Sequence, residues 1–278
     1  MIYIRPVGGI CNRLRSIASA YSLAKEHGQY IHVFWIVNSE INCEFEKCLY
    51  IKEEVKSSIS VQNIYDDTET DEIVSLSEVF EEEQEEDFIM KYKENPQKNY
   101  YVRSFSEFYP CDMKLFVPAV DINSEIDTLL CNSDMTNIIG IHIRRTDLEI
   151  GKKKSPLWLF LFVMILHCML NHKTKFYIAT DDLLERKRII RIFKNRCIYN
   201  EKIVLGRNSE QGIKDGIVDL FALSRCKQIY GTYWSSFSDI AGKLGGGRSY
   251  PLYRRSFIQL IYLYLFNVVK NISVLRKH

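Results

Sequence analysis

The chain has little glycine and proline, and its cysteines are scattered along the sequence. With 13 glycines and 6 prolines among 278 residues, a collagen-like or low-complexity chain is excluded. No CxxC pair occurs among the eight cysteines, so the spacing of a zinc site is absent. The N-terminus lacks a basic stretch followed by an apolar one, so we expect reduced cysteines in a cytoplasmic protein.

Strong net charge and long apolar runs are also lacking. The formal net charge is +2, which disfavours a nucleic-acid partner. The apolar runs 157–170 and 257–269 are too short for a typical membrane-spanning helix. The small net charge nevertheless conceals an asymmetry. Residues 57–90 hold twelve Asp and Glu and no Lys or Arg, whereas Lys243–His278 holds seven Lys and Arg and no acid.

Strand-like and helix-like segments alternate in a pattern that is typical of an α/β fold. The first half opens with a strand at Ile2–Arg5, a helix capped by Asn12 that stops at Gly28, and a strand at Ile31–Val37. In the second half we expect strands at 138–143, 175–179, 203–205 and 228–231 and helices at 157–170, 182–193, 212–224 and 236–244. This pattern predicts two Rossmann-like domains, at residues 1–135 and 136–250, followed by a basic and apolar tail at 251–278.

Three segments allow more than one interpretation. Asp66–Asp87 predicts a solvated, mobile acidic insertion near 57–90, or an acidic docking surface. Leu157–Leu170 predicts a buried helix. The tail run Phe257–Val269 is flanked by basic residues, so it either packs back on the protein or lies peripherally on the inner, anionic face of a membrane.

Two arginines follow a predicted strand in the sequence Gly140–Asp147, which reads GIHIRRTD. Ligands of open α/β sheets bind at the carboxyl ends of strands, and an arginine fork can hold two phosphate oxygens at once. Adjacent side chains on a strand point to opposite faces. We therefore expect one of Arg144 and Arg145 to meet a ligand and the other to organise the loop, unless an arginine and an aspartate only cap the strand.

Three more segments carry polar side chains at predicted strand ends. Phe176–Asp182 ends in two carboxylates, which could bind a ribose or a base, unless Thr180 or Asp181 only caps the next helix. Thr232–Ser238 places hydroxyls at a helix N-terminus, which suits an anion or a plain serine cap. Gly8–Arg13 is a glycine turn without the third glycine of GxGxxG or the GK[ST] of a Walker loop.

These four segments, in this order, resemble the fucosyltransferase superfamily, which includes the α1,2-, α1,6- and protein O-fucosyltransferases and a bacterial Nod-factor enzyme. The matching pieces are GGICNRL, HIRRTD, FYIATDD and DGIVDLFALSRCKQIYGTYWSSFSDIA, from about residue 3 to 245, with a thin match between 38 and 99. The resemblance implies a GT-B-like architecture with two domains facing each other across a cleft. It also implies transfer of fucose from GDP-fucose to a glycan acceptor, in the synthesis of a surface polysaccharide or glycoconjugate.

The resemblance also implies roles for individual residues. Arg144 or Arg145 would clamp the donor diphosphate. Further catalytic candidates are Asp147 and Glu149, donor-binding candidates are His142, Asp181, Asp182, Asp219, Ser235, Ser236 and Phe237, and cleft or acceptor-side candidates are Gly9, Asn12, Arg13 and Glu107.

The sequence contains no Asp-x-Asp, the usual cation-bridging signature of metal-dependent transferases. We therefore expect an inverting enzyme without a metal, in which arginine and helix amides stabilise the leaving diphosphate. Some relatives carry a catalytic glutamate five positions beyond the motif's aspartate, but Lys152 stands there. Glu149 is the nearest substitute for the base, or an exposed loop acid. The alternatives are a GT-B enzyme that uses another nucleotide sugar and a non-catalytic nucleotide- or glycan-binding relative.

Overall fold

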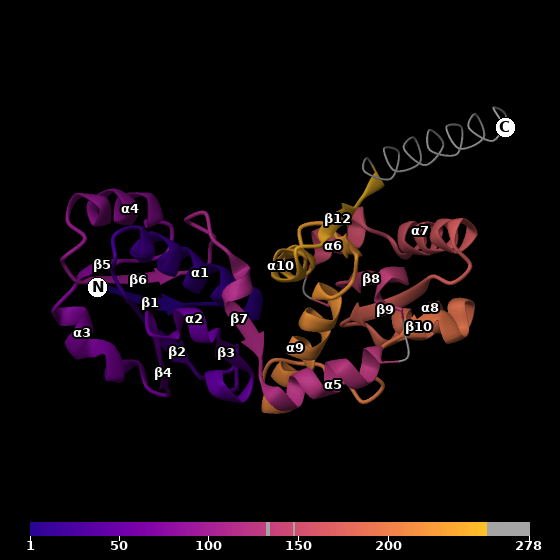
Figure 1. The fold of residues 1–278 in the computed structure, drawn as a ribbon, viewed down its shortest axis with the longest axis horizontal. Helices are drawn as coiled ribbons and strands as arrows, with labels where there is room; N and C mark the ends of the chain where they lie inside the picture. Colours follow the sequence, from indigo (N-terminus) through magenta and orange to yellow (C-terminus); the bar gives the residue numbers. More distant parts are fainter. Residues whose placement is uncertain (132–133, 147, 255–278) are drawn as a thin grey trace. The chain divides into compact units, whose positions relative to one another are not determined.

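The computed structural model describes residues 1–131, 134–146 and 148–254 (Figure 1). The chain divides into two compact units, each with its own five-stranded parallel sheet. The N-terminal unit holds residues 1–131, 200–224 and 243–246, and the C-terminal unit holds the remaining described residues. The α/β class predicted from the sequence is confirmed for both units.

The sheet of the N-terminal unit has the strand order β4-β2-β1-β6-β5, and all its strands are parallel. The strands are β1 (Ile2–Pro6), β2 (Ile31–Ile36), β4 (Ile59–Ile64), β5 (Glu78–Phe80) and β6 (Tyr100–Ser104). The chain starts in the centre at β1, builds one side through β2 and β4, and then builds the other side. The order therefore reverses between β1 and β6, where the carboxyl ends of strands leave room for a ligand.

Helix α1 (Ile10–Glu26) connects β1 to β2 and is buried along most of its length. Its N-cap is Gly9, and no side chain caps it, so the prediction that Asn12 caps the helix was wrong: Asn12 lies in the first turn. Gly28 lies just beyond the helix with φ +63°, a backbone conformation that suits glycine and ends the helix as expected.

The acidic segment 66–87 contributes a strand to the sheet, so it is not an insertion outside the fold, but most of its acidic side chains are solvated as predicted. It supplies the edge strand β5, which pairs with β6 in parallel register. Phe80 is buried, and its ring packs against Phe88 of α4 (Glu85–Glu94) and against Tyr100. The isolated apolar side chains therefore anchor the segment to the sheet, while most of the acidic side chains remain in solvent.

The N-terminal unit is completed by smaller elements. A two-stranded antiparallel sheet pairs β3 (Leu49–Ile51) with β7 (Phe116–Pro118). The remaining helices are α2 (Glu53–Lys56), α3 (Asp71–Ser75), α5 (Val120–Leu130) and α9 (Glu210–Ser224). Although α9 follows β10 in the sequence, it packs on α5 and therefore belongs to this unit.

The sheet of the C-terminal unit has the strand order β10-β9-β8-β11-β12 and is also parallel throughout. The strands are β8 (Ile138–Ile143), β9 (Lys175–Thr180), β10 (Cys197–Ile198), β11 (Gln228–Thr232) and β12 (Arg248–Leu252). The helices are α6 (Glu149–Lys154), α7 (Leu157–Leu170), α8 (Leu183–Phe193) and α10 (Ser236–Gly245). The strand order reverses between β8 and β11. Open α/β sheets bind ligands at the carboxyl ends of strands at such a reversal.

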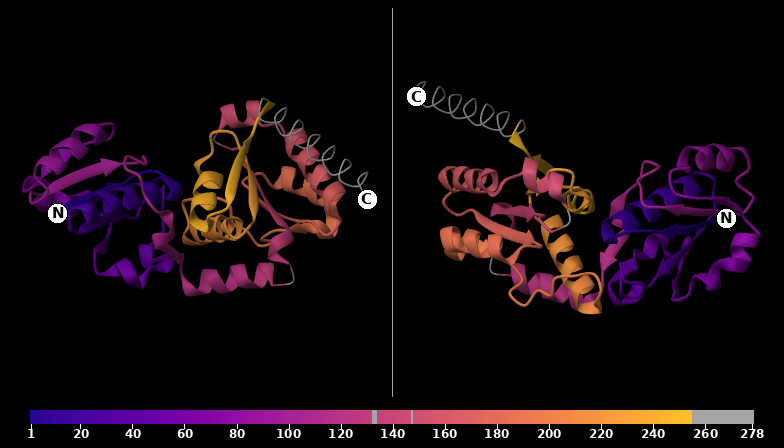
Figure 2. Two further views of the ribbon diagram at one scale, coloured as in Figure 1. Left: turned by 45° about the horizontal axis from the view of Figure 1, so that its top comes forward. Right: turned by 180° about the vertical axis from the view of Figure 1, so that it is seen from behind.

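Helices α7 and α8 lie side by side on one face of this sheet (Figures 1 and 2). Their inner side chains share one core with the strands, in which Phe160 and Met164 of α7 and Ile189 of α8 meet Ile141 of β8. The outer side of α7 is exposed, so the prediction of a wholly buried helix was only half right.

Two further expectations differ from the structure. Residues 203–205 form no strand, because the backbone N–H of Val204 donates to the Asp215 carboxylate at 2.6 Å instead of joining the sheet. The strand β12 was not expected. It is an edge strand of the sheet, a position in which Pro251 is tolerated. No helix among the described residues is long and apolar enough to cross a membrane. All eight cysteines lie within these residues, and none of them forms a disulfide bond.

Candidate functional site

The candidate site of the C-terminal unit lies at the ends of β8 and β11. The backbone N–H of Arg144, just after β8, donates to Thr232 Oγ1 of β11 at 2.9 Å. The residue after Thr232, Tyr233, donates its backbone N–H to Ser155 Oγ at 2.9 Å. The two strand ends are therefore held together at the point where the strand order reverses, and Arg144 begins the loop that leads from β8 to α6.

Arg145 is buried, and its guanidinium group donates hydrogen bonds to other groups of the protein. Its side chain is 3% exposed, its Nε donates to Glu185 Oε2 at 2.9 Å, and a terminal nitrogen donates to the carbonyl oxygen of Ser155 at 2.9 Å. Its guanidinium also lies over the Phe160 ring. Arg145 therefore fastens the loop to α8 and to the segment before α7.

Arg144 has a more open side chain. It is 22% exposed, and its Nε lies 3.9 Å from Asp181 Oδ2, which is an ion pair but too long for a hydrogen bond. Arg145 is therefore the arginine that organises the loop, and binding of a ligand by Arg144 stays a prediction.

Asp181 shapes the arginine loop. One carboxylate oxygen accepts the backbone N–H of Arg145 at 2.7 Å, and the other accepts the backbone N–H and hydroxyl of Thr146 at 3.1 and 2.6 Å. The neighbouring Asp182 is the N-cap of α8 and accepts the backbone N–H groups of Leu184 and Glu185. Both carboxylates are occupied by the protein, and the helix cap is Asp182 rather than the predicted Thr180 or Asp181.

His142 of β8 and Phe237 of α10 form a stacked pair, with ring centroids 4.7 Å apart. Burial, and secondarily the charge of Arg144, lowers the pKa of His142 to about 3, so its imidazole is neutral at physiological pH. Its Nδ1 is buried without a hydrogen-bond partner within the described residues. The pair supports the first turn of α10 without adding charge.

The turn between β11 and α10 is tightly packed and strained. A Cβ on Gly231 would lie 2.0 Å from Ser238 Oγ, so only glycine lets α10 approach β11 this closely. Trp234 has φ +63°, which is rare for an aromatic residue and costs about 1–3 kcal/mol, and its side chain is 73% exposed. Ser235 and Ser236 follow at the start of α10, and the first backbone amides of a helix favour an anion.

The remaining candidates of this group are Asp147, Glu149 and Asp219. Asp147 lies outside the described residues. The Glu149 side chain is 90% exposed at the start of α6 and pairs with Lys153 at 3.9 Å, as expected of a solvated acid. Asp219 is buried on α9, in the N-terminal unit.

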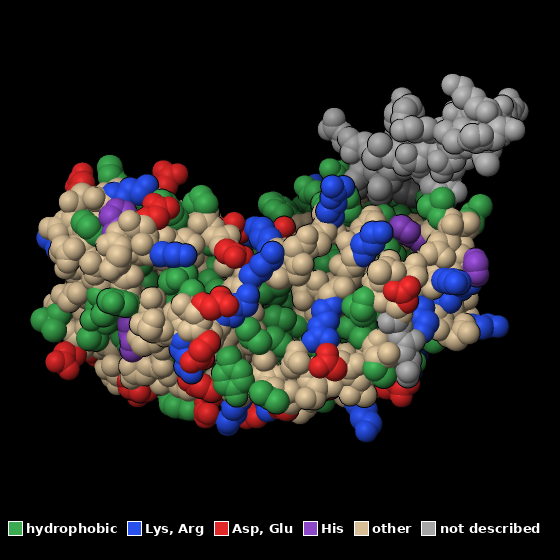
Figure 3. Space-filling view, viewed as in Figure 1, with side chains coloured by type: hydrophobic (Ala, Val, Ile, Leu, Met, Phe, Trp, Pro, Cys, Tyr) green, Lys and Arg blue, Asp and Glu red, His purple; other side chains and the backbone are tan. Residues whose placement is uncertain are grey.

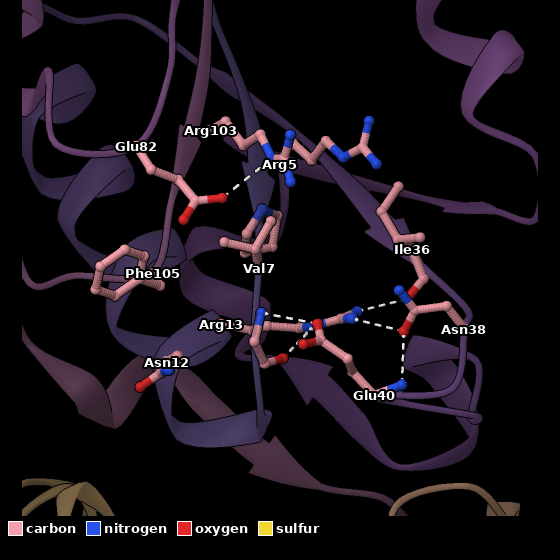
Figure 4. Close-up of a pocket in the computed structure, with 12 residues that line it drawn as sticks. Arg5, Val7, Asn12, Arg13, Ile36, Asn38, Glu40, Glu82, Arg103 and Phe105 are labelled. Atoms are coloured by element: carbon pink, nitrogen blue, oxygen red, sulfur yellow. Dashed lines mark hydrogen bonds and ion pairs between the residues drawn. The ribbon is translucent and has the colours of Figure 1, made fainter.

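The N-terminal unit has a pocket of about 250 Å³ at its own strand-order reversal (Figure 4). It is formed by the ends of β1, β2 and β6 and the start of α1. Its lining residues are Arg5, Pro6, Val7, Gly8, Asn12, Arg13, Ile36, Asn38, Glu40, Glu82, Arg103 and Phe105. Guanidinium donors, carboxylate and amide acceptors and one aromatic ring thus surround a single space.

Arg13 forms the floor of this pocket. It is 1% exposed, its Nε donates to the carbonyl oxygen of Gly8 at 3.0 Å, and a terminal nitrogen donates to that of Ile36 at 2.5 Å. Burial lowers the pKa of Arg13 to about 10, so the side chain remains charged at neutral pH. Its role is to tie the glycine turn to the end of β2.

The other acceptor-side candidates surround this turn. Gly9 begins α1, and Asn12 accepts a hydrogen bond from Arg15 at 2.9 Å. Glu40 accepts the backbone N–H of Gly8 at 3.1 Å. Glu107 does not line the pocket and pairs with Lys243. Among the residues that the structure describes, no group of His, Cys, Asp or Glu side chains is arranged to hold a metal ion.

Sequence reasoning missed several residues of both sites. In the C-terminal unit these are Thr232, Glu185 and Ser155, whose contacts join segments far apart in sequence. In the N-terminal unit they are Arg5, Arg103, Glu40 and Glu82. The two arginines could have been found, because each lies near the carboxyl end of an apolar strand, as Arg144 does.

The chain has the fold of solved fucosyltransferases, which confirms at the level of the fold the resemblance seen in the sequence. NodZ, an α-1,6-fucosyltransferase from Bradyrhizobium that was co-crystallised with GDP, has a TM-score of 0.61 and 18% identity, covering 86% of this chain and 91% of that chain. A mutant of Arabidopsis thaliana FUT1 in complex with GDP has a TM-score of 0.58 and 13% identity, covering 91% and 70%. POFUT1 in complex with GDP-fucose has a TM-score of 0.56 and 11% identity, covering 90% and 96%. No protein-family model and no curated protein sequence matches the chain.

Proposed function

We propose that this protein is a glycosyltransferase that transfers fucose from GDP-fucose to a glycan acceptor. The observation that carries the proposal is the partly exposed Arg144 at the point where the strand order of the C-terminal sheet reverses, beside β11, the strand that leads into α10. Solved proteins of the same fold hold GDP or GDP-fucose. We further propose the GT-B arrangement, in which donor and acceptor domains face each other across a cleft.

The chemistry requires a site that stabilises a departing diphosphate. In an inverting transfer, the bond between the fucose anomeric carbon and the diphosphate oxygen breaks while an acceptor oxygen bonds to the opposite face of that carbon. Negative charge grows on the diphosphate. The Arg144 fork and the backbone amides of Ser236 and Phe237 are the donors that we assign to it.

The surrounding residues hold these donors in position. Arg145 and Asp181 fix the backbone of the loop, so Arg144 can respond to charge without reorganising it. Ser235 and Ser236 are assigned hydrogen bonds to phosphate oxygens. With no Asp-x-Asp in the sequence, we assign to arginine and helix amides the role that a metal ion takes in other transferases.

The pocket of the N-terminal unit is our proposed acceptor site. A sugar hydroxyl both donates and accepts, and the pocket offers guanidinium donors beside the acceptors Asn38, Glu40 and Glu82. Phe105 adds an aromatic face for the apolar side of a sugar ring. Within this pocket, Glu40 and Glu82 are the carboxylates chemically able to accept the proton of an acceptor hydroxyl, a role for which the exposed Glu149 is poorly suited.

A nucleotide panel tests the donor assignment. Melting temperatures are measured with GDP, UDP, CDP and ADP, followed by assays of GDP release from GDP-fucose. Of the four nucleotides, we expect only GDP to stabilise the protein, by about 2.7 kcal/mol at a hundredfold excess over its Kd. The response should be lost in Arg144→Ala and kept in Arg191→Ala, which removes an exposed arginine of the same unit.

The same panel separates the alternatives. Stabilisation by UDP or another nucleotide in place of GDP would assign the fold to a different nucleotide sugar. Binding of GDP without release of fucose, with or without glycan acceptors, would indicate a non-catalytic relative. Either result contradicts the proposed fucose transfer.

A further inference from the structure

Helix α7 carries apolar side chains on both of its sides, although only one side faces the sheet. Its inner side chains Phe160, Val163 and Met164 are at most 3% exposed. On the outer side, Trp158 is 48% exposed, Ile165 47%, Met169 71% and Leu170 58%. Residues 158, 165 and 169 recur at helical spacing, so they form one stripe along the helix. An exposed apolar stripe of this kind marks an interaction surface.

The neighbouring helix α8 is basic on its outer side. Lys187, Arg188 and Arg191 are exposed there, together with the apolar Leu184 and Ile192. Because α7 and α8 cover the same face of the sheet, the two outer sides adjoin each other (Figures 1 and 2). We call this combined outer side the α7–α8 surface.

The charge of this part of the chain is strongly biased. Residues 149–196 hold eleven Lys and Arg but four Asp and Glu. Of these acids, Asp181, Asp182 and Glu185 are occupied by the hydrogen bonds of the arginine loop and the α8 cap. Lys and Arg side chains, with hydrophobic ones between them, are spread over the visible surface of the unit in Figure 3.

We propose that the α7–α8 surface docks on an anionic lipid bilayer. The apolar stripe of α7 would lie in the interface between headgroups and acyl chains, and the α8 cations would pair with lipid phosphates. A tryptophan at the start of the stripe suits this interface. The inference concerns the folded body of the protein and does not depend on the proposed donor chemistry.

Other occupants fit these observations less well. A second copy of the chain would bring like charges together. A nucleic acid would pair with α8 but would leave the α7 stripe uncovered. The C-terminal run Phe257–Val269 has Gln259 and Asn267 as its only polar residues apart from two tyrosines, so covering α7 with it would present a new apolar surface. That run is itself flanked by Arg254, Arg255 and Lys270, as a lipid-facing segment would be.

Vesicle sedimentation of the full-length chain tests the proposal. The vesicles are phosphatidylcholine alone or phosphatidylcholine with about 30% phosphatidylglycerol. We expect binding only to the anionic vesicles, and weaker binding when NaCl is raised from about 0.1 to about 1 M. Arg188→Gln with Arg191→Gln should weaken partitioning roughly 25-fold, since each basic residue near the surface contributes about fivefold.

The apolar stripe is tested by Ile165→Glu with Met169→Glu, for which we expect at least about a tenfold loss. The matched control is Leu76→Glu with Met90→Glu, which alters two similarly exposed apolar residues of the N-terminal unit and should leave binding unchanged. Circular dichroism checks the fold, and the single variant Met169→Glu serves if the double variant unfolds. Unchanged vesicle binding of the folded stripe variant would overturn the proposal. The proposal would also be overturned if the protein formed a concentration-dependent dimer that dissociates in the stripe variant. It would likewise be overturned if RNA displaced the protein from the vesicles and the stripe variant made no difference to this competition.

Discussion

The adjacent residues Arg144 and Arg145 carry the same side chain but different structural tasks. Arg145 is surrounded by Glu185, the Ser155 carbonyl group and the Phe160 ring. Arg144 has a partly exposed side chain and one long ion pair with Asp181 among its contacts. The sequence predicts that the two differ, but the contacts in the fold decide which one is buried.

This difference predicts separate effects on stability. Arg145→Ala should lower the free energy of unfolding by about 3 kcal/mol, because it leaves Glu185 partly buried without its partner. Arg144→Ala should lower it by less than about 1 kcal/mol. Urea denaturation of both variants measures the difference. Equal stabilities would contradict the structural role of Arg145.

The buried neutral His142 predicts a pH effect on stability. Its pKa is about 3 in the folded protein and near 6.5 when unfolded, so the unfolded chain binds a proton that the folded chain refuses. Its contribution to stability is therefore complete above pH 6.5 and declines as the pH falls toward 3. Between pH 7 and pH 5 this costs about 2 kcal/mol.

Replacing the imidazole by a ring that does not titrate isolates this effect. In His142→Phe, which can keep the stack on Phe237, the loss of stability between pH 7 and pH 5 should be about 2 kcal/mol smaller than in the wild type. Unfolding curves at the two pH values give the comparison. The same pH dependence in both proteins would show that His142 is not kept neutral by burial.

Among the elements, α10 depends on close approach to β11. Gly231→Ala places a methyl group within 2.0 Å of Ser238 Oγ, so α10 must shift. We expect a loss of about 1–3 kcal/mol in stability and weaker binding of GDP, because the helix start moves away from Arg144. The control is Gly216→Ala on α9, where a Cβ meets no atom within 4 Å and helix propensity favours alanine by about 1 kcal/mol. If Gly231→Ala binds GDP normally, the position of α10 is not important for the donor site.

The sequence predicts most of the central strands, but it misses β6 and the edge strands. Ile138–Ile143 is mostly apolar because the strand is buried on both faces, and its bounds agree with the structure. Glu78–Phe80 and Arg248–Leu252 contain charged residues and a proline, which edge strands tolerate, so no local pattern distinguishes them from loops. The sequence likewise did not reveal that the outer side of α7 is exposed, because an apolar helix has the same sequence whether one or both of its sides are covered.

The candidate site was predictable in position but not in detail. Strand ends locate Arg144, Asp181 and Ser235 at one edge of the sheet, because parallel strands end there together. Which of these groups is already occupied depends on partners such as Thr232, which is 88 residues away from Arg144. Long-range partners of this kind leave no periodic signal in the sequence.

At the scale of the whole molecule, the two sheets share the same kind of strand order, but charged segments of opposite sign belong to the two units. Each sheet starts at its centre, reverses its strand order once and collects arginines at the reversal. The twelve acids of residues 57–90 belong to the N-terminal unit, and the basic α7–α8 surface belongs to the C-terminal unit. We expect this division to separate an acceptor-binding unit from a donor-binding unit that docks on lipid.

The proposed leaving-group chemistry also predicts the response to chelators. Fucose transfer should continue in excess EDTA, because arginine and helix amides carry the stabilisation of charge. Activity is measured as GDP release before and after chelation. Loss of activity that Mg²⁺ or Mn²⁺ restores would contradict this assignment.

The most direct test is the turnover of GDP-fucose by the wild type and by Arg144→Ala and Arg144→Lys. The account predicts release of GDP by the wild type and a loss of about 100- to 1000-fold in kcat for Arg144→Ala, with the fold intact. Arg144→Lys should not restore the rate, because an ammonium group lacks the two-pronged fork. No turnover by the wild type with any glycan acceptor, or a normal rate in Arg144→Ala, would contradict it.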